Sequence, residues 1–411
     1  MQTSAQTPVY IDLFAGCGGI SLGLCNAGWR GLFAIEKSPM AFGTLKHNLI
    51  GKENHFDWPA WLPVSAHDIT DVLRDYEAEL KKLQGKVDLV AGGPPCQGFS
   101  LAGRRNENDK RNKLAESYVK FVDLVKPRIL FFENVIGFTI GFKNQTARGK
   151  AYSEYVENKL DAIGYNVSDD IIDFSEYGIP QRRRRFVLVG TQKEIQNANP
   201  EQYFNKIKEV KKIFLLSKGL TETVPLHEAL SDLERKHGEV PSPKGSFKEG
   251  IYGEPKSHYQ TWMRSNQNGK LPDSHRFARH KKKTIERWTY ILANCPRDTP
   301  LSEEWKAKFG LKKKTITPLE RKSSCPTLTT LPDDYIHYSE PRILTVREYA
   351  RIQSFPDWYE FKDKYTTGGK RRKAEVPRYT QIGNAVPPLF GELSGIVLGM
   401  IENERTAQVQ N

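Results

Sequence analysis

The sequence is poor in cysteine and methionine, and it lacks a long uninterrupted apolar run. Its 411 residues include five cysteines and four methionines, and no two cysteines form a Cys-x-x-Cys pair. That pattern argues against a disulfide framework and against a zinc site. No apolar run approaches the roughly 18 to 20 residues that cross a bilayer, and residues 1–8 do not resemble a signal peptide. We therefore expect a soluble, cytoplasmic protein that needs no metal.

Acidic residues are fewer than basic ones. The sequence has 49 Asp and Glu against 62 Lys and Arg, which leaves a net charge of +13. A surplus of this size suggests a polyanionic partner. Residues 256–322 hold 17 basic and 6 acidic side chains, whereas residues 193–255 hold 10 of each. Two lysine triplets mark the basic segment: Lys281, Lys282 and Lys283, and Lys312, Lys313 and Lys314. A single charged run is most often a solvated surface, but several together favour a binding face.

The composition, 38% hydrophobic and 11% aromatic, is that of a globular chain long enough for two domains. The first 190 residues alternate strand-like and helix-like stretches, which predicts an α/β domain with a largely parallel sheet. We expect strands at residues 9–14, 32–35, 64–69, 87–91, 128–132 and 186–189.

Regularity fades after residue 192, where proline and glycine breaks become frequent. One helix start is clear within this part, because Thr345 followed by Glu348 forms a capping box. From Val386 to Ile401 the apolar residues keep three- and four-residue spacing, which predicts an amphipathic helix that packs on the sheet. We therefore expect residues 1–192 and 378–411 to form one domain and residues 193–377 to be an inserted, loop-rich second domain.

The predicted strand ends carry unusual residues, and ligands bind at this edge of an open α/β sheet. The turn Gly16-Cys17-Gly18-Gly19 lets a ligand approach the backbone, Glu36 follows about 20 residues later, where an acid can bind ribose hydroxyls, and Asp68 is expected at a third strand end. Together they indicate a nucleoside-containing cofactor. The third glycine of the dinucleotide pattern is missing, which disfavours NAD without excluding it.

A second candidate site follows the strand at residues 87–91. There the stiff loop Gly92-Gly93-Pro94-Pro95-Cys96 holds one thiol, and Gln97 and Ser100 beside it are poor core residues. A lone cysteine is usually an inert core residue, yet this context favours a nucleophile. Glu133, at the next strand end, is by itself an ordinary strand-end carboxylate. If the two strands are neighbours, a thiol and a carboxyl share one crevice.

Four consecutive arginines precede the last predicted strand of the first domain. Alternation puts Arg183 and Arg185 on one face and Arg182 and Arg184 on the other. Charges of one sign at this density favour an anionic group nearby.

These motifs resemble those of the DNA cytosine-5 methyltransferases, in particular the bacterial restriction-modification type. The resemblance rests on five motifs in the family's order: Asp12-Leu13-Phe14-Ala15-Gly16-Cys17-Gly18-Gly19, Pro94-Pro95-Cys96-Gln97, Glu133-Asn134-Val135, Gln181-Arg182-Arg183-Arg184-Arg185 and Gln381-Ile382-Gly383-Asn384-Ala385-Val386. It spans residues 9–190 and 326–400. It implies a Rossmann-like methyltransferase domain with helices on both faces of the sheet, and an inserted target-recognition domain.

The resemblance also implies the cofactor, S-adenosylmethionine, with S-adenosylhomocysteine as product. Its pocket would be formed by Phe14, Ala15, Gly16, Cys17, Gly18, Gly19, Glu36, Asp68, Ile69, Pro95, Leu114, Asn384, Ala385 and Val386. Lys37 departs from the family pattern, in which an aromatic residue often lies beside the adenine.

By the same resemblance, Cys96 would add to carbon 6 of a flipped-out cytosine in a specific double-stranded DNA sequence, and carbon 5 would then take the methyl group. Glu133 would bind the base, and Arg183 and Arg185 would hold the base and its phosphate. The expected DNA contacts are Gln97, Ser100 and the two lysine triplets.

Two other readings of the motifs remain open at this point. One is the RNA-directed branch of the family, which methylates transfer RNA; the other is a nucleic-acid-binding module without catalysis. For the DNA enzyme we expect a monomer in the bacterial cytoplasm, associated with the nucleoid through DNA, with a cognate restriction endonuclease acting separately.

Overall fold

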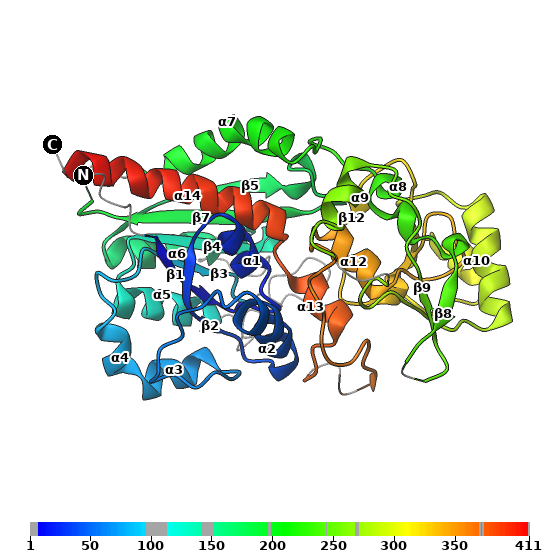
Figure 1. The fold of residues 1–411 in the computed structure, drawn as a ribbon, viewed down its shortest axis with the longest axis horizontal. Helices are drawn as coiled ribbons and strands as arrows, with labels where there is room; N and C mark the ends of the chain where they lie inside the picture. The colour runs from blue at the N-terminus through cyan, green and yellow to red at the C-terminus, as the bar shows by residue number, and fades with distance from the viewer. Residues whose placement is uncertain are drawn as a thin grey trace, which may run out of the picture. The chain divides into compact units, whose positions relative to one another are not determined.

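The structure is a computed structural model that describes residues 7–95, 113–140, 152–195, 199–243, 245–267, 271–369, 371 and 374–409 (Figure 1). The chain divides into two compact units. The first unit comprises Met1–Asp173, Arg184–Phe214 and Phe390–Asn411, and the second comprises Phe174–Arg183 and Leu215–Leu389.

The first unit is built on a six-stranded sheet with the strand order β2-β1-β3-β4-β7-β5. Strands β1 to β4 pair in parallel, whereas β7 lies antiparallel to both β4 and β5. The sheet is therefore mixed, with a parallel half that carries the predicted strand ends. The strands are β1 (Val9–Leu13), β2 (Arg30–Ile35), β3 (Leu89–Gly92), β4 (Ile129–Val135), β5 (Tyr165–Asp173) and β7 (Arg184–Gln192).

Two sequence expectations about strands need correction. Residues 64–69 do not form a strand, because Asp68 is instead the N-cap of helix α3 and its carboxylate accepts a hydrogen bond from the Thr70 N–H. Strand β4 also continues through Glu133 to Val135, because these residues pair with the antiparallel strand β7. Glu133 therefore lies within the sheet rather than beyond its edge.

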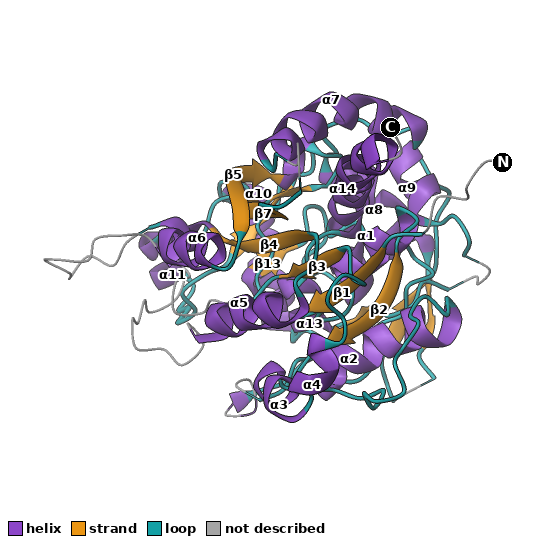
Figure 2. Ribbon diagram, turned by 90° about the vertical axis from the view of Figure 1, so that its left-hand side faces the viewer, coloured by secondary structure: helices purple, strands orange, loops and turns teal. Residues whose placement is uncertain are grey.

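Helices cover both faces of this sheet (Figure 2). Ile11 and Leu13 of β1 point into an apolar core that includes Val72, Tyr118 and Leu160, from three helices on one face. On the other face, residues of β3, α1 and α14 surround a small apolar cavity. The helices are α1 (Gly19–Asn26), α2 (Pro39–Leu45), the π-helix η1 (Lys46–Lys52), α3 (Ile69–Asp75), α4 (Glu77–Lys81), α5 (Lys113–Val125), α6 (Tyr152–Ala162), α7 (Glu201–Ser217) and α14 (Pro388–Val409).

The C-terminal helix α14 returns to the first unit and runs along its sheet (Figure 1), as its apolar spacing predicts. The Trp29 indole N–H donates to the Gly395 carbonyl at 2.8 Å, and Arg128 lies 2.6 Å from the Glu402 carboxylate. The sequence led us to expect no apolar segment long enough to cross a bilayer, and one segment departs from this expectation. Residues 378–402 are long and apolar enough by composition, but 72% of the most apolar window is buried inside the protein, as in a core helix.

The second unit contains short elements joined by long connections. Its helices are α8 (Leu226–Leu230), α9 (His258–Met263), α10 (Lys282–Asn294), α11 (Glu303–Lys308), α12 (Val346–Ile352) and α13 (Arg378–Asn384). Its strands are β6 (Gln181–Arg182), β8 (Glu239–Pro241), β9 (Lys248–Gly250), β10 (Arg276–Phe277), β11 (Thr317–Pro318), β12 (Cys325–Pro326) and β13 (Tyr335–Ile336). Strands β8, β9 and β10 form an antiparallel sheet, whereas β11 with β13 and β12 with β6 form parallel pairs.

Charged groups hold the centre of the second unit together. The fully buried Arg351 on α12 lies 2.5 Å from the Asp232 carboxylate and 2.7 Å from that of Asp357. Removing one partner of such a buried group leaves an uncompensated charge, which is strongly destabilising. Helix α12 begins with the predicted capping box, in which the Thr345 side chain and the Glu348 side chain each accept from the other's backbone N–H.

The borders of the two units differ from those of the domains expected from the sequence, which were residues 1–192 with 378–411 and residues 193–377. Most of α7, up to Phe214, belongs to the first unit, and residues 378–389 belong to the second. Within the first unit the hydroxyls of Tyr203 on α7 and Ser394 on α14 are 2.8 Å apart, and the Tyr203 ring lies against Phe131 of β4. These contacts explain why α7 belongs with the sheet.

Candidate active site

The glycine turn after β1 leaves open space beside the backbone. Phe14, Gly16 and Gly18 all have positive φ, at 59°, 57° and 89°. A Cβ added at Gly16 would meet no atom of the described residues within 4 Å, so none of these residues covers this part of the turn. A bulky residue such as Phe14 rarely adopts a left-handed conformation, and such residues cluster at functional sites.

Glu36, which follows the last residue of β2, is tied directly to this turn. Its carboxylate accepts hydrogen bonds from the Gly16 N–H at 3.0 Å and the Ser38 N–H at 2.6 Å. Burial raises the pKa of Glu36 above its ordinary value, although these backbone N–H groups oppose the shift. The sequence brought Glu36 and the glycine turn together as a site, and the structure joins them by a hydrogen bond.

Asp12 is a site feature that the sequence analysis named only as part of a motif. Its side chain is fully buried, Oδ2 accepts from the Ser21 hydroxyl at 2.5 Å, and Oδ1 has no hydrogen-bond partner among the described residues. Burial raises the pKa of Asp12 to about 7, and the nearby Glu36 adds to the shift. An acid inside an apolar strand was the sequence signal for this behaviour.

Asp68 and Ile69 occupy the start of helix α3. Ile69 is buried in the main core, whereas Asp68 pairs with Lys37 at 2.6 Å. Burial alone would raise the pKa of Asp68, but the Lys37 ammonium and the Thr70 hydrogen bonds lower it below its ordinary value. Lys37, the residue that departs from the family pattern, is thus the ion partner of a predicted cofactor ligand.

The other predicted cofactor residues are distributed over both units. Leu114 on α5 packs against the same core as Phe14, and Pro95, the last described residue after β3, is exposed. Residues 384–386, which link α13 to α14, belong to the second unit. Their part in a cofactor pocket stays a prediction.

The ends of β3 and β4 bring the second group of site residues together. Because these strands are neighbours, Gly93 lies against Glu133: a Cβ added at Gly93 would lie 3.1 Å from Glu133 Oε2. The Asn134 amide donates to the Pro94 carbonyl at 3.3 Å, which ties the loop to β4. The loop therefore lies beside Glu133 at Gly93 and Pro94, and the expected pairing of the Cys96 thiol with Glu133 stays a prediction.

Arg185 of β7 completes this group. Its Nε lies 2.9 Å from Glu133 Oε1, and the two side chains are each 11% exposed. Across the sheet, Arg185 pairs with Val135, two residues after Glu133 on the same strand. The antiparallel pairing of β7 with β4 therefore places a guanidinium on the carboxylate, a contact that the sequence did not predict.

The arginine run has the predicted alternation. Arg183 is buried, whereas Arg182 and Arg184 are exposed, and Arg182 pairs with Asp298 at 2.8 Å within the second unit. Arg183 belongs to the second unit and Arg185 to the first. Cys96, Gln97 and Ser100 lie outside the described residues, so their roles stay predictions.

The lysine triplets differ in what surrounds them. The first triplet, Lys281, Lys282 and Lys283, lies at the start of α10 and is exposed. In the second triplet, Lys312 and Lys314 are exposed as well. None of these five lysines forms an ion pair with a described residue. Lys313 lies 2.6 Å from Asp333 and 2.8 Å from Asp334. Its charge is already neutralised within the second unit, so Lys313 is the least suited of the six to a phosphate.

Comparison with known families decides what this arrangement belongs to. The family model for C-5 cytosine-specific DNA methylases matches residues 9–393. The chain belongs to this family. It is a DNA cytosine-5 methyltransferase, and the reading as a module without catalysis is set aside.

The methylase is similar to bacterial Type II methyltransferases over nearly its whole length. It is 31% identical to M.DdeI of Desulfomicrobium norvegicum over 93% of this chain and 86% of that protein. It is 30% identical to M.XorII of Xanthomonas oryzae pv. oryzae over 94% of this chain and 84% of that protein. These relatives connect the methylase with restriction-modification systems and favour DNA over the RNA alternative.

Solved structures support the fold. A candidate DNA modification methyltransferase encoded within an E. coli prophage superimposes with a TM-score of 0.66 at 23% identity, covering 97% of this chain and all of the other. The Dnmt2 methyltransferase of S. pombe gives a TM-score of 0.51 at 14% identity, covering 97% of this chain and 99% of the other. The fold is the Rossmann-like fold of S-adenosylmethionine-dependent methyltransferases.

The family uses S-adenosylmethionine as its methyl donor, and the first unit has features that suit this molecule. The space at Gly16 leaves the backbone open to a ligand as far as the described residues go, and the Glu36 carboxylate beside it is suited to ribose hydroxyls. The residues of the glycine turn therefore fit the cofactor.

Proposed function

We propose that the methylase transfers a methyl group from S-adenosylmethionine to carbon 5 of a flipped-out cytosine, through a covalent adduct with Cys96, in a specific double-stranded DNA sequence. The observation that carries the proposal is the contact between Glu133, Arg185 and the loop that leads into Cys96. It supports a carboxylate held in a fixed position beside the thiol.

S-adenosylmethionine supplies a methyl group activated by its sulfonium. Phe14 to Gly19 would lie beside the cofactor, Glu36 would accept from the ribose hydroxyls, and Asp68 with Ile69 would bind the adenine. Pro95, Leu114 and residues 384–386 would complete the pocket. Since Lys37 pairs with Asp68, we propose that this lysine orients the carboxylate and takes the place of an aromatic residue beside the adenine.

The residues around Cys96 would solve the chemical difficulty that carbon 5 of cytosine is a weak nucleophile. The Cys96 thiolate forms a bond to carbon 6, and the electrons of the 5,6 double bond make carbon 5 enamine-like. The methyl group would pass to carbon 5 with S-adenosylhomocysteine as the leaving group. Carbon 5 would then give its proton to solvent, and the electrons of that bond would re-form the double bond and expel the thiolate. A base inside the duplex cannot be reached in this way, so it must be flipped out.

Glu133 and the arginines would stabilise this reaction. A protonated Glu133 carboxyl would donate to ring nitrogen 3, where negative charge develops as the thiolate adds, and would accept from the exocyclic amine. Arg185 fixes the orientation of Glu133 through its ion pair. Arg183 would favour the Cys96 thiolate and, with Arg185, hold the base and its phosphate.

The remaining proposals concern DNA and the cell. The insertion expected at residues 193–377, of which the part from residue 215 lies in the second unit, would form the target-recognition domain, and Gln97, Ser100 and the exposed lysines would contact DNA. We propose that the methylase acts as a monomer in the bacterial cytoplasm, associated with the nucleoid through DNA, with a cognate restriction endonuclease acting separately.

The test of the adduct uses Cys96→Ser and a matched control, Cys25→Ser, on the partly buried cysteine of α1. We expect Cys96→Ser to abolish methyl transfer and keep DNA binding, because a hydroxyl is a far poorer nucleophile than a thiolate, and the control to stay active. Duplex DNA with 5-fluorocytosine at the target should trap a covalent complex with the unmodified protein, since fluorine does not leave as the proton does. Normal turnover by Cys96→Ser, or recovery of free DNA alone, would refute the adduct.

A further inference from the structure

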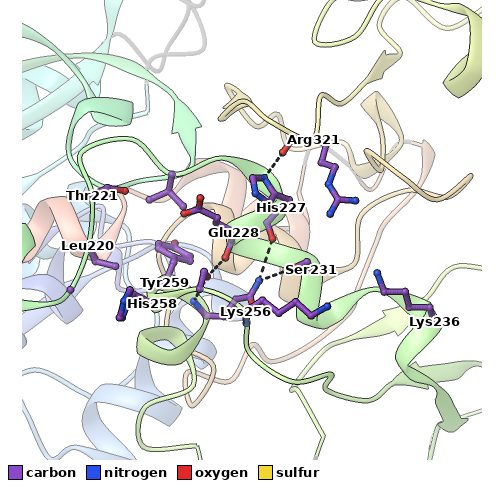
Figure 3. A pocket seen from close by; sticks show the side chains of 14 residues that line it. Leu220, Thr221, His227, Glu228, Ser231, Lys236, Lys256, His258, Tyr259 and Arg321 are labelled. Carbon is purple, nitrogen blue, oxygen red and sulfur yellow. Dashed lines mark hydrogen bonds between the residues drawn. The ribbon is translucent and has the colours of Figure 1, made fainter.

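The second unit contains a pocket that the proposed methyl transfer does not use. It lies between α8, α9 and the chain just before α8, and its cavity volume is about 380 Å³ (Figure 3). None of the residues proposed for the cofactor, the base or the DNA lines it. Pockets of about 300 Å³ or more are large enough to hold a small ligand.

Hydrogen bonds from one buried amide hold the walls of the pocket in place. Gln260 on α9 donates to the Ser231 hydroxyl at 2.8 Å and to the His227 carbonyl at 3.2 Å, and it accepts from the Lys256 N–H at 2.6 Å. The neighbouring Tyr259 hydroxyl donates to the Arg351 carbonyl at 2.5 Å, in the buried ionic centre of the unit. The pocket is therefore fixed before any ligand binds.

The charge of the lining is predominantly positive. Lys236, Lys256 and Arg321 line the pocket together with a single carboxylate, that of Glu228, and the cationic ends of the three lie toward the same side of it in Figure 3. Lys236 already pairs with Glu234, which does not line the pocket.

The other two cations that line the pocket are Lys256 and Arg321. Neither forms an ion pair with a described residue; the Arg321 guanidinium lies 5.8 Å from the centre of the Tyr338 ring and contributes to the lowered pKa of Glu234. These residues stand at the two ends of the basic segment, 256–322, and the fold brings them to one cavity. Two exposed cations at a pocket whose walls are held by hydrogen bonds favour an oxyanion.

We propose that this pocket binds a phosphate group, either a phosphodiester of bound DNA or the phosphate of a free nucleotide. Arginine suits this ligand because its planar guanidinium binds two phosphate oxygens at once, and a lysine adds a mobile point charge. The pocket has room for a phosphate with an attached sugar. The DNA source rests on the proposed function, whereas the free-nucleotide source does not.

The first experiment measures phosphate binding without methyl transfer. Thymidine 5′-monophosphate and inorganic phosphate are titrated into the full-length protein by calorimetry, using the Cys96→Ser background so that the result does not depend on turnover. We expect saturable binding that weakens at least tenfold in the double variant Lys256→Gln/Arg321→Gln. The matched control is Lys86→Gln/Lys212→Gln, which removes the same charge from two exposed lysines outside the pocket.

The second experiment identifies the source of the phosphate. If it is DNA, the pocket variant lowers the salt dependence of duplex binding by about 0.9 for each lost phosphate contact, and the control does not. If it is a free nucleotide, duplex binding of the pocket variant matches the control while nucleotide binding is lost. Equal nucleotide binding and equal salt dependence in both variants would overturn the proposal, and thermal unfolding verifies that both are folded.

Discussion

At the scale of single residues, the buried Glu133 and the half-buried Glu36 are carboxylates with different partners. Glu133 meets Arg185 and the loop toward Cys96, whereas Glu36 holds the backbone of the glycine turn. We expect Glu133→Gln to lower the methylation rate by about 100-fold or more, with little change in affinity for S-adenosylmethionine, because its carboxyl acts on the base. Glu36→Gln should instead weaken cofactor binding by about tenfold and spare DNA binding.

Calorimetry with S-adenosylmethionine and single-turnover methylation separate these two variants. Arg185→Lys tests the positioning role in the same assay, because an ammonium keeps the charge but loses the planar guanidinium. It should reduce the rate and leave cofactor affinity unchanged. The reverse pattern for the two glutamates would mean that the base site and the cofactor site have been exchanged.

Asp12 should make the stability of the protein depend on pH. Since burial raises its pKa to about 7, the folded protein keeps a proton on Asp12 that the unfolded chain, with an ordinary pKa of 3.8, has already released. Raising the pH from about 4 to about 7 therefore costs folding stability, by up to about 4 kcal/mol, and the cost persists at higher pH.

Asp12→Asn tests this dependence, because its side chain does not titrate. Whatever constant offset the substitution causes, the free energy of unfolding of the variant should fall less between pH 5 and pH 8 than that of the unmodified protein. Urea unfolding at both pH values measures the difference. Parallel changes in the two proteins would show that Asp12 is ionised throughout this range.

At the scale of elements, the contact between α1 and α14 depends on the absence of a side chain. A Cβ at Gly23 of α1 would lie 2.5 Å from the backbone of Gly391 and Glu392 on α14. We expect Gly23→Ala to destabilise the protein by about 1 to 3 kcal/mol, because two backbones must move apart. Gly43→Ala on α2 is the control, since a Cβ there meets no atom within 4 Å in the part of the chain that the structure describes.

The control substitution should be neutral or stabilising, because alanine is favoured over glycine in a helix by about 1 kcal/mol. Denaturant unfolding of both variants gives the comparison. Equal effects of the two substitutions would mean that α14 does not pack on α1 as closely as described.

At the scale of the whole molecule, the positive charge of residues 256–322 should act through DNA phosphates. Replacing Lys281, Lys282 and Lys283 with Gln should reduce the slope of log affinity against log salt by up to about 0.9 per lost contact. The variant should methylate the same sites more weakly, since phosphate contacts carry no sequence information. Lys313→Gln is the control, because Asp333 and Asp334 already neutralise that lysine.

Fluorescence anisotropy across a salt series provides the slopes, and mapping of modified cytosines provides the sites. A triple variant with the slope of the unmodified protein would exclude this face from DNA binding. A change in which cytosines are modified would mean instead that these lysines read bases.

The sequence determined those features that depend on residues close together in the chain. The glycine turn after β1 and the Thr345–Glu348 capping box formed where expected, because both depend on backbone geometry over a few residues. The return of α14 to the sheet also followed, since its apolar spacing requires a large apolar surface. The order of the motifs was enough to indicate the family.

Only the tertiary structure decided what depends on partners far apart in the chain. It made Asp68 a helix cap rather than a strand end, and it placed Arg185 on Glu133 through an antiparallel strand pair. It also brought Lys256 and Arg321, at opposite ends of the basic segment, to one cavity. Local patterns do not specify such contacts, because strand order, burial and long-range packing arise only when the whole chain has folded.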